Sequence, residues 1–301
     1  MRIQQIETAR KQTLYFVIPK EKRNLKRTFG AIKKTLLDNE VLLVYNYCGD
    51  LKMKEREYTI TKANELIQKS RYSLSTQQQK IILYLISQIN PKATEFKKAK
   101  FKIQEFCKVC GIDCESGKNY TSLKEQIKKI SDRSCWVKLE DGRETILRWI
   151  EKPYIDEKSG TIEIIFDKDM KPFLLELRKN FTQFELSYAL LFKSKYSIRL
   201  FELLESYHYH KLEPLEKKFN IEELKKILDC ENYKAFKDFR LRVLDTAVKE
   251  INENTMYNLK YDLIKEVRTY TEIVFYLDKK EVIQQMETHQ QNNRKFNKKE
   301  V

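Results

Sequence analysis

One order of predicted elements occurs twice along this chain of 301 residues. In the first half, a helix predicted over about 121–131 is followed by two stretches of alternating polarity that flank Asp141-Gly142. In the second half, a long basic helix over about 233–252 is followed by another such pair. An apolar period of about 3.6 residues that changes to a period of about two indicates a helix and then a hairpin. Because helix, basic helix and hairpin is the order of a winged helix-turn-helix, the sequence predicts an α+β, helix-rich fold with two such domains in tandem.

The remaining elements are predicted from caps, breakers and apolar spacing. Thr61 is expected to cap a helix, as are Ser75 and Asn220, because their side chains can accept hydrogen bonds from a first helical turn. The predicted elements of the first domain are helices over 62–69, 76–89 and 104–111, strands at Phe101 to Ile103, 135–139, 144–150 and 161–166, and the basic helix. Those of the second are helices over 185–193, 197–209 and 221–228, the long basic helix, and wing strands over 259–264 and 271–277.

These elements divide the chain into four predicted segments. Residues 1–55 match no recognisable pattern and are treated as an appendage of unknown structure. The first winged-helix domain is predicted over 56–178 and the second over 179–279. The segment 280–301 is polar and rich in Lys and Gln, so it is expected to be disordered.

Composition restricts the class of partner. The chain has 59 Lys and Arg against 44 Asp and Glu, a formal net charge of +15, which favours a polyanion such as nucleic acid. Its apolar runs are too short to cross a bilayer, and its first residues do not resemble a secretory signal, so a cytoplasmic protein without membrane contact is expected. With only 6 Gly and 5 Pro, the chain shows no Gly-rich phosphate loop and no cofactor is predicted.

The long basic helix is the predicted reader of DNA sequence. Helical spacing places one set of apolar side chains together, namely Phe236, Val243, Leu244, Ala247 and Ile251. The opposite side is expected to carry Lys234, Lys237, Leu241, Arg242, Asp245 and Lys249. Arg242 is the candidate for a bidentate contact to guanine and Leu241 for a thymine methyl, while the lysines neutralise phosphates. Arg240 falls near the apolar stripe and is expected to reach a phosphate from the helix edge. The alternative for this helix alone is an ordinary solvated charged face.

Four stretches carry a family resemblance: SRYSLSTQQQKIILYLISQI at 70–89, SLKEQIKKISDRS at 122–134, FTQFELSYALLFKSKYSIRLFELL at 181–204, and DFRLRVLDTAVKEIN at 238–252. On them, the segment from Tyr58 to about Lys279 resembles the plasmid replication initiators of the Rep_3 type. That family has tandem winged-helix domains and binds repeated origin sequences called iterons in double-stranded DNA.

The resemblance implies specific roles for the two domains. The second domain would make the main contacts to one end of an iteron, with Lys237, Arg240 and Arg242 on the matching basic positions. The first would hold the other end through Lys124, Lys128 and Lys129, and would also join two copies into a dimer in equilibrium with the monomer. The resemblance further implies opening of the origin, contact with the host initiator and replicative helicase, and repression of the chain's own promoter at an operator. At Leu241 some relatives have Arg.

Two alternatives to this function stay open. A winged-helix transcriptional regulator without a replication role would use the same contacts to DNA. A metal-dependent nicking enzyme is suggested by His208-Tyr209-His210, but residues two apart on a helix point in different directions and cannot hold one ion. We therefore predict no catalytic residue and no enzyme activity.

Three cysteines, Cys107, Cys110 and Cys114, have a spacing that could supply metal ligands. The same spacing places them on one helical face, where free Cys packs as a small apolar residue. A closed zinc site needs about four ligands, and Cys135 is the only other donor nearby. We expect reduced, buried thiols and no metal.

Overall fold

The computed structural model describes residues 58–110, 117–139, 141–156, 158–211 and 213–297. Contacts divide the chain into the units Met1–Met53 and Lys54–Val301, and the description below concerns the second. The predicted appendage 1–55 lies outside the described residues.

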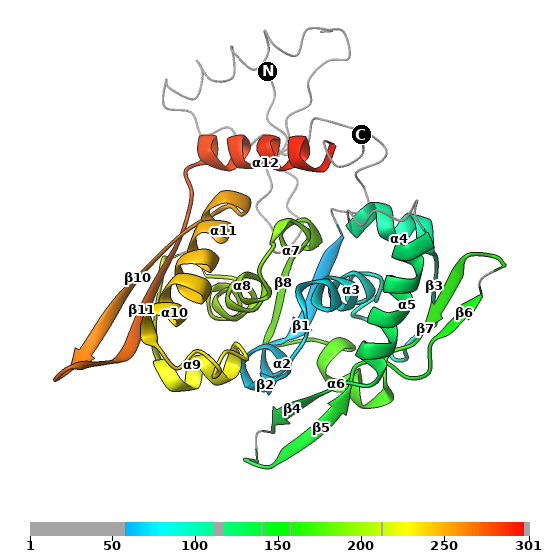
Figure 1. The fold of residues 1–301 in the computed structure, drawn as a ribbon, viewed down its shortest axis with the longest axis horizontal. Coiled ribbons are helices and arrows are strands. Elements are labelled where there is room, and N and C mark those ends of the chain that lie inside the picture. Colours follow the sequence, from blue (N-terminus) through cyan, green and yellow to red (C-terminus); the bar gives the residue numbers. More distant parts are fainter. Residues whose placement is uncertain (1–57, 111–116, 140, 157, 212, 298–301) are drawn as a thin grey trace, which may run out of the picture. The chain divides into compact units, whose positions relative to one another are not determined.

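The first winged-helix domain has the predicted order of helices with more strands than expected (Figure 1). Its elements are β1 (Thr59–Ala63), α2 (Asn64–Lys69), β2 (Ser70–Arg71), α3 (Thr76–Ser87), β3 (Ala99–Lys102), α4 (Ile103–Cys110), α5 (Gly117–Ser131), β4 (Ser134–Lys138), β5 (Glu144–Arg148), β6 (Tyr154–Asp156), β7 (Thr161–Ile164), a 3-10 turn (Lys168–Met170) and α6 (Lys171–Leu174).

The predicted caps of the first domain have opposite outcomes. Ser75 caps α3 as predicted: its side chain accepts from the Gln78 amide, and the Gln78 side chain accepts from the Ser75 amide. Thr61 caps no helix, because it lies in β1, and α2 begins after Ala63 without a side-chain cap. Antiparallel pairing of β1 with β8 (Phe181–Glu185) fixes this segment as a strand, and tertiary pairing of this kind overrides local preference.

The hairpin at Asp141-Gly142 forms as predicted, but it does not occupy the position of a wing. Strand β4 pairs with β5 and, on its other side, with β2. The expected third strand, β7, pairs instead with β3 and β6. The β6–β7 hairpin is therefore the one joined to the strand that precedes the helix-turn-helix.

The second winged-helix domain follows the predicted order closely. The elements that follow residue 179, where the sequence predicts the start of this domain, are β8, α7 (Leu186–Leu191), α8 (Lys195–His208), β9 (Leu215–Asn220), α9 (Ile221–Ile227), α10 (Phe236–Phe239), a π-helical segment (Arg240–Asp245), α11 (Thr246–Asn254), β10 (Tyr257–Glu266), β11 (Thr269–Lys279) and α12 (Val282–Asn297). Asn220 caps α9 as predicted by accepting from the amides of Glu222 and Glu223. Strand β11 pairs with both β10 and β9, so the long wing is continuous with the strand before the helix-turn-helix.

Helix α8 connects the two domains. It packs against α2 and α3 on one side and against α11 on the other. Within this contact Lys62 Nζ lies 2.8 Å from Glu202 Oε1, and both side chains are 1% exposed. Arg199 joins the pair: it donates to the carbonyls of Ile67 and Ser70, and it stacks over the Tyr72 ring. A buried charge is tolerated only when it is paired and hydrogen-bonded. The buried cluster of Lys62, Glu202 and Arg199 therefore fixes the positions of β1, α2 and α8 relative to one another.

The expected disorder of 280–301 is wrong for most of the segment, because 282–297 form α12. Its polar residues replace apolar packing with hydrogen bonds: Lys280 Nζ donates to the carbonyls of Asn252 and Thr255 and to the Thr288 hydroxyl. Asn292 likewise donates to the Asn254 carbonyl. These bonds satisfy carbonyl groups at the C-terminal end of α11.

The expectation of reduced thiols is wrong at Cys107, although its side chain is buried as expected. Cys135 and Cys230 are free and buried. Cys107 is disulfide-bonded, which shows that a cysteine count too low for a secreted framework does not exclude a single bridge. The side chains of Cys110 and Cys114 lie outside the described residues.

Candidate nucleic-acid interface

The predicted reader is one continuous helix with a widened turn in its middle. We call residues 236–254 the recognition helix; they comprise α10, the π-helical segment and α11. A π turn closes its hydrogen bonds five residues apart rather than four, so it adds one residue to the turn. The Thr246 hydroxyl donates to the carbonyl of Leu241, five residues earlier.

This extra residue changes which side chains face the core. Val243 and Leu244 are both fully buried, whereas Leu241 is 58% exposed and Arg242 is exposed beside it. Ala247 and Ile251 are buried as predicted, but Phe236 is only partly buried. Its predicted place in the core is taken by Phe239, which a regular helical period did not select. Leu241 and Arg242 lie together on the outer surface, as the regular helical period already predicted, and the differences from that prediction fall at Phe236 and Phe239.

The other predicted contacts of the second domain are exposed as well. Lys234 precedes the recognition helix, and Lys237, Arg240 and Lys249 lie along it. Arg242 Nε lies 3.9 Å from an Asp238 oxygen and Lys249 Nζ lies 4.0 Å from a Glu253 oxygen. Exposed ion pairs at such distances contribute little stability, so a phosphate can replace the carboxylate at small cost.

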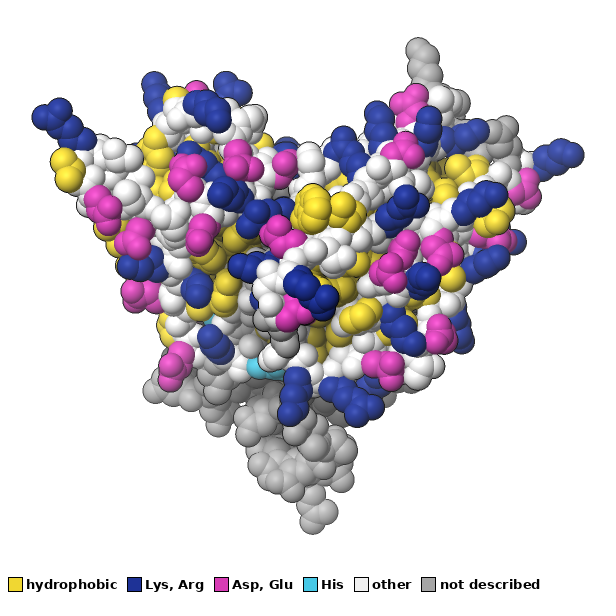
Figure 2. Space-filling model, turned by 90° about the horizontal axis from the view of Figure 1, so that it is seen from below, with side chains coloured by type: hydrophobic (Ala, Val, Ile, Leu, Met, Phe, Trp, Pro, Cys, Tyr) yellow, Lys and Arg dark blue, Asp and Glu magenta, His cyan; other side chains and the backbone are white. Residues whose placement is uncertain are grey.

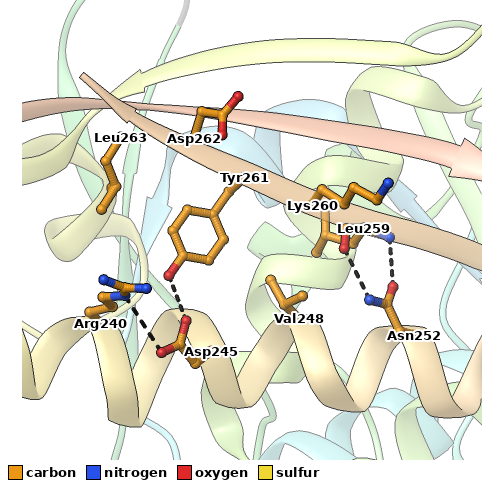
Figure 3. A pocket seen from close by; sticks show the side chains of 9 residues that line it. All are labelled: Arg240, Asp245, Val248, Asn252, Leu259, Lys260, Tyr261, Asp262 and Leu263. Atoms are coloured by element: carbon orange, nitrogen blue, oxygen red, sulfur yellow. Dashed lines mark hydrogen bonds and ion pairs between the residues drawn. The ribbon is translucent and has the colours of Figure 1, made fainter.

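Three contacts hold the wing against the recognition helix. Near its start, the Phe236 ring stacks on Tyr270 of β11 with centroids 4.6 Å apart. In the middle, the Tyr261 hydroxyl of β10 donates to Asp245 Oδ1 at 2.5 Å. Near its end, the side chain of Asn252 bonds both the amide and the carbonyl of Leu259 (Figure 3). The wing and the helix are thus a single rigid surface.

Sequence reasoning missed the partners that make this surface rigid. Asp245 was placed on the outer side without a role, and Tyr261 was read only as part of a strand. Burial, followed by the bond to Asp245, raises the pKa of Tyr261 to about 12, so the phenol stays protonated and donates at neutral pH. The available signal was the alternation of β10, which puts Tyr261 on the face that also holds Leu259.

The first domain presents a surface formed by α5 and the short β6–β7 hairpin. On α5, Lys128 and Lys129 are exposed as predicted and Lys124 is half-buried. The Gln78 side chain of α3 donates a hydrogen bond to the Gln126 side chain of α5. On the β6–β7 hairpin, Tyr154 is exposed, and the ammonium groups of Lys98, just before β3, and Lys152, just before β6, lie 5.6 and 5.5 Å from its ring centroid.

Lys and Arg side chains are spread over the face on which β4 and β5 lie, with acidic side chains between them (Figure 2). Hydrophobic side chains are exposed near its middle (Figure 2). The cross-strand pair Trp136 and Ile146 of the β4–β5 hairpin is about half exposed. The positive charge is therefore distributed over this face rather than gathered in one patch.

The histidine pair does not form a metal site. His208 is the last residue of α8, as predicted, and is buried, whereas His210 lies beyond the helix and is exposed. Desolvation by burial lowers the pKa of His208. Across the part of the chain that the structure describes, three or more His, Cys, Asp or Glu side chains are nowhere grouped to hold a metal ion. In the same residues, no helix is long and apolar enough to cross a membrane.

Comparison with known sequences finds two matching parts of one family. The initiator replication protein family, WH1, matches residues 59–205, and the initiator Rep protein family, WH2, matches residues 220–277. A replication initiation protein of Escherichia coli is 27% identical over 230 residues, which cover 74% of this chain and 70% of that protein.

A solved structure has the same fold. The crystal structure of the Pi initiator protein in complex with iteron DNA superimposes with a TM-score of 0.62 at 21% sequence identity. The superposition covers 75% of this chain and 99% of that chain. The prediction of two tandem winged-helix domains is therefore confirmed.

Proposed function

The chain belongs to the initiator replication protein family, and from this premise we propose that it initiates plasmid replication by binding iterons in double-stranded DNA. The observation that carries the proposal is the recognition helix, which exposes Leu241 and Arg242 beside a wing fixed to the same helix. The similarity to an initiator solved with iteron DNA supports it.

In this proposal the two domains divide the work of binding. The recognition helix enters a major groove, where Arg242 makes a bidentate contact to guanine and Leu241 packs on a thymine methyl. Lys234, Lys237, Arg240 and Lys249 contact phosphates and fix the register. The first domain grips the other end of the repeat through Lys124, Lys128 and Lys129, which carry no sequence information by themselves.

The chain acts by binding and not by covalent chemistry. Bound to adjacent repeats in the cytoplasm, it deforms the origin, promotes opening of an AT-rich region, and brings in the host initiator and replicative helicase. A dimer joined through the first domain, in equilibrium with the monomer, represses the chain's own promoter. Bending DNA costs deformation energy, which is offset by the additional protein contacts that the bend permits. A protein that binds DNA through two separate domains can make such additional contacts.

The test is footprinting of the purified full chain on DNA from upstream of its own gene, at two salt concentrations with random duplex as competitor. Protection of evenly spaced direct repeats supports an iteron binder. Binding that disappears equally on specific and random DNA as salt rises would show only phosphate contacts and overturn the proposal.

A transcriptional regulator without a replication role is the second candidate, because its contacts to DNA would be the same. It predicts protection of a single inverted repeat at a promoter. A plasmid that carries the gene and its upstream repeats, but lacks any other origin, separates the two functions: maintenance of that plasmid requires an initiator.

A further inference from the structure

Helix α8 does not complete its N-terminal cap with its own residues. In a capping box, the residue three positions after the cap accepts a hydrogen bond from the amide of the cap itself. Helix α3 has this arrangement within its own sequence, because Gln78 accepts from the Ser75 amide. Helix α8 is capped by Ser194, whose side chain accepts from the Tyr196 amide, but its third position holds Ser197 rather than Glu or Gln. The acceptor for the Ser194 amide therefore comes from elsewhere in the chain.

Glu250 of the recognition helix supplies that acceptor. Its Oε2 atom accepts from the amide of Lys193 at 3.0 Å and from the amide of Ser194 at 3.2 Å. Amide groups at the start of a helix carry partial positive charge, and their hydrogen bonds to a carboxylate are stronger than those between neutral groups. The family match to WH1 ends at residue 205, within α8, and the match to WH2 begins at residue 220. A helix of the first matched part is therefore capped by a side chain of the second.

The residues that connect α7 to α8 are also held by helix α3. We call residues 190–194 the α7–α8 turn. The Lys80 ammonium of α3 donates to the carbonyl of Leu190 at 2.6 Å, and the Thr76 hydroxyl of α3 donates to the carbonyl of Lys193 at 3.2 Å. The α7–α8 turn thus accepts two hydrogen bonds from α3 and donates two to the recognition helix.

These bonds complete a path between the two helices that are predicted to contact DNA. Helix α3 contacts the basic helix α5 through the bond from Gln78 to Gln126. The path continues from α3 to the α7–α8 turn and from that turn to Glu250 (helices α3, α5, α7, α8 and α11 are labelled in Figure 1). A shift of the recognition helix relative to the first domain would therefore break the bonds to Glu250.

Polar bonds fix a relation that apolar packing leaves adjustable. Helix α11 packs against α8, and its buried side chains include Ala247 and Ile251. Burial of apolar surface is non-directional, so it holds the two helices together but permits small shifts along and around their axes. Hydrogen bonds depend on distance and angle. The two bonds to Glu250 therefore fix the position of the recognition helix along α8.

We propose that Glu250 is a positioning residue that sets the distance and rotation between α5 and the recognition helix, and so makes binding selective for the spacing between the two ends of a repeat. The inference rests on the proposed binding of one repeat by both domains and adds to it a residue that acts through α8. One inserted base pair moves one end of a site by about 3.4 Å along the duplex and about 34° around it. Two helices held in one relation cannot follow this displacement, whereas helices joined by apolar packing alone can follow part of it.

The experiment measures binding of the purified full chain to the natural repeat and to repeats with one base pair inserted or deleted at the centre. Wild type should bind both altered repeats more weakly. Glu250→Ala should reduce this loss of affinity by about three- to tenfold, because the recognition helix can then shift along α8. Glu250→Gln keeps an oxygen that accepts from the same amides and should stay close to wild type. Thr76→Val, which removes the hydroxyl donor on α3, should act like Glu250→Ala but more weakly, because Lys80 still holds Leu190.

The matched control is Glu253→Ala. Glu253 is an exposed carboxylate on the same helix, and it pairs with Lys249 of that helix. Its removal changes the net charge by the same amount, so it should raise affinity for all three duplexes by one factor and leave their ratios unchanged. If Glu250→Ala behaves like this control, or if wild type binds the altered repeats as tightly as the natural one, the positioning role is overturned.

A measurement on the free protein separates this inference from the proposed function. The backbone amides of Lys193 and Ser194 should exchange slowly with solvent in wild type and faster in Glu250→Ala, with no change in Glu253→Ala. Fast exchange of both amides in wild type would show that the bonds to Glu250 are not held in solution, and would overturn the inference without reference to DNA. If the amides are protected but wild type does not prefer the repeats to random duplex, the origin-binding function fails and the selectivity for spacing fails with it, while the link between the helices stands.

Discussion

The wing of the second domain has strands of 10 and 11 residues, whereas the equivalent β6–β7 hairpin of the first has strands of 3 and 4. The long wing is tied to its recognition helix at three points, by Phe236, Asp245 and Asn252. Helix α5 packs through the buried side chains of Leu123, Ile127 and Ile130, and Gln126 accepts a hydrogen bond from the Gln78 side chain. Two copies of one element order thus differ in the length of the wing, and the proposed function assigns base contacts to the domain with the longer one.

The two domains also differ in the chemistry of their turns. In the hairpin turns of the first domain, positive φ angles of 87° and 61° fall on Gly142 and Gly160. In the second, the wing turn places fully exposed Val267 at a φ of 56°, a conformation that is unfavourable for a β-branched residue. Four predictions test how far this comparison extends.

The largest effect is expected at the buried cluster that joins the domains. Glu202→Gln leaves the Lys62 ammonium buried without its counter-charge and should lower the free energy of unfolding by about 3–5 kcal/mol. Both tryptophans of the chain, Trp136 and Trp149, lie in the first domain, so fluorescence reports that domain and far-UV circular dichroism reports both. Coincident urea transitions for the two probes are expected. Separate transitions would show that the domains unfold independently.

A pH-dependent effect on stability is expected at Glu205 of helix α8. Burial raises the pKa of Glu205, which is 4% exposed, to about 7 from an ordinary 4.5. The folded state therefore holds a proton that the unfolded state releases, and stability is lost as pH rises from about 4.5 to 7. Each pKa unit corresponds to about 1.4 kcal/mol, so wild type should lose a few kcal/mol over this range that Glu205→Gln retains.

The measurement is urea unfolding of both proteins at pH 5 and pH 8. Glu205 accepts from the Tyr257 hydroxyl, and glutamine preserves an oxygen for that bond. Tyr257→Phe serves as the control, since it removes the bond while the carboxyl stays buried. Equal pH dependence in wild type and Glu205→Gln would contradict the assignment.

In DNA binding, the two domains should respond differently to the loss of one cation. Arg242→Ala should cost about 1–3 kcal/mol on the repeat and relax preference at one base pair. Lys128→Ala in the first domain should weaken repeat and random duplex alike, by less than about 1 kcal/mol, and flatten the salt dependence. Titrations of both variants on both duplexes give the four affinities. Equal losses of affinity for repeat and random DNA in Arg242→Ala would contradict the assignment of a base contact to Arg242.

The smallest effect is expected in the turns. Val267→Asn should stabilise the second domain by up to about 1 kcal/mol, because Asn tolerates a positive φ better than a β-branched residue. Gly160→Ala, at the corresponding turn of the first domain, should destabilise by a similar amount. Thermal unfolding of the two variants measures both. A loss of stability in Val267→Asn would indicate that the valine is held by contacts other than its turn.

Local signals predicted most of the fold. The Ser75 and Asn220 caps, the turn at Asp141-Gly142 and the repeated element order were all readable, because each depends on residues close together in sequence. Strand β8 and the pairing of β7 with β3 were not, since such pairings are decided by distant partners. Helix α12 was missed because its stabilising bonds go to α11 rather than to an apolar face.

The candidate site was predicted in outline but not in detail. Charge and period located the recognition helix and its exposed cations. They could not show the π turn, because an analysis at a constant angle per residue assumes a regular α-helix and cannot include a turn with one additional residue. Phe239 was therefore missed as a core residue, and the ion pair between Arg240 and Asp245 was hidden.

The ties between wing and recognition helix have a kinetic consequence. A DNA-binding surface that is already ordered in the free protein loses little conformational entropy on binding, because that entropy was lost when the protein folded. Association with different repeats should then proceed at similar rates, set by diffusion and charge, and the repeats should differ mainly in how long the protein stays bound. An origin with several repeats would be filled quickly, and its occupancy would depend on residence time at each of them.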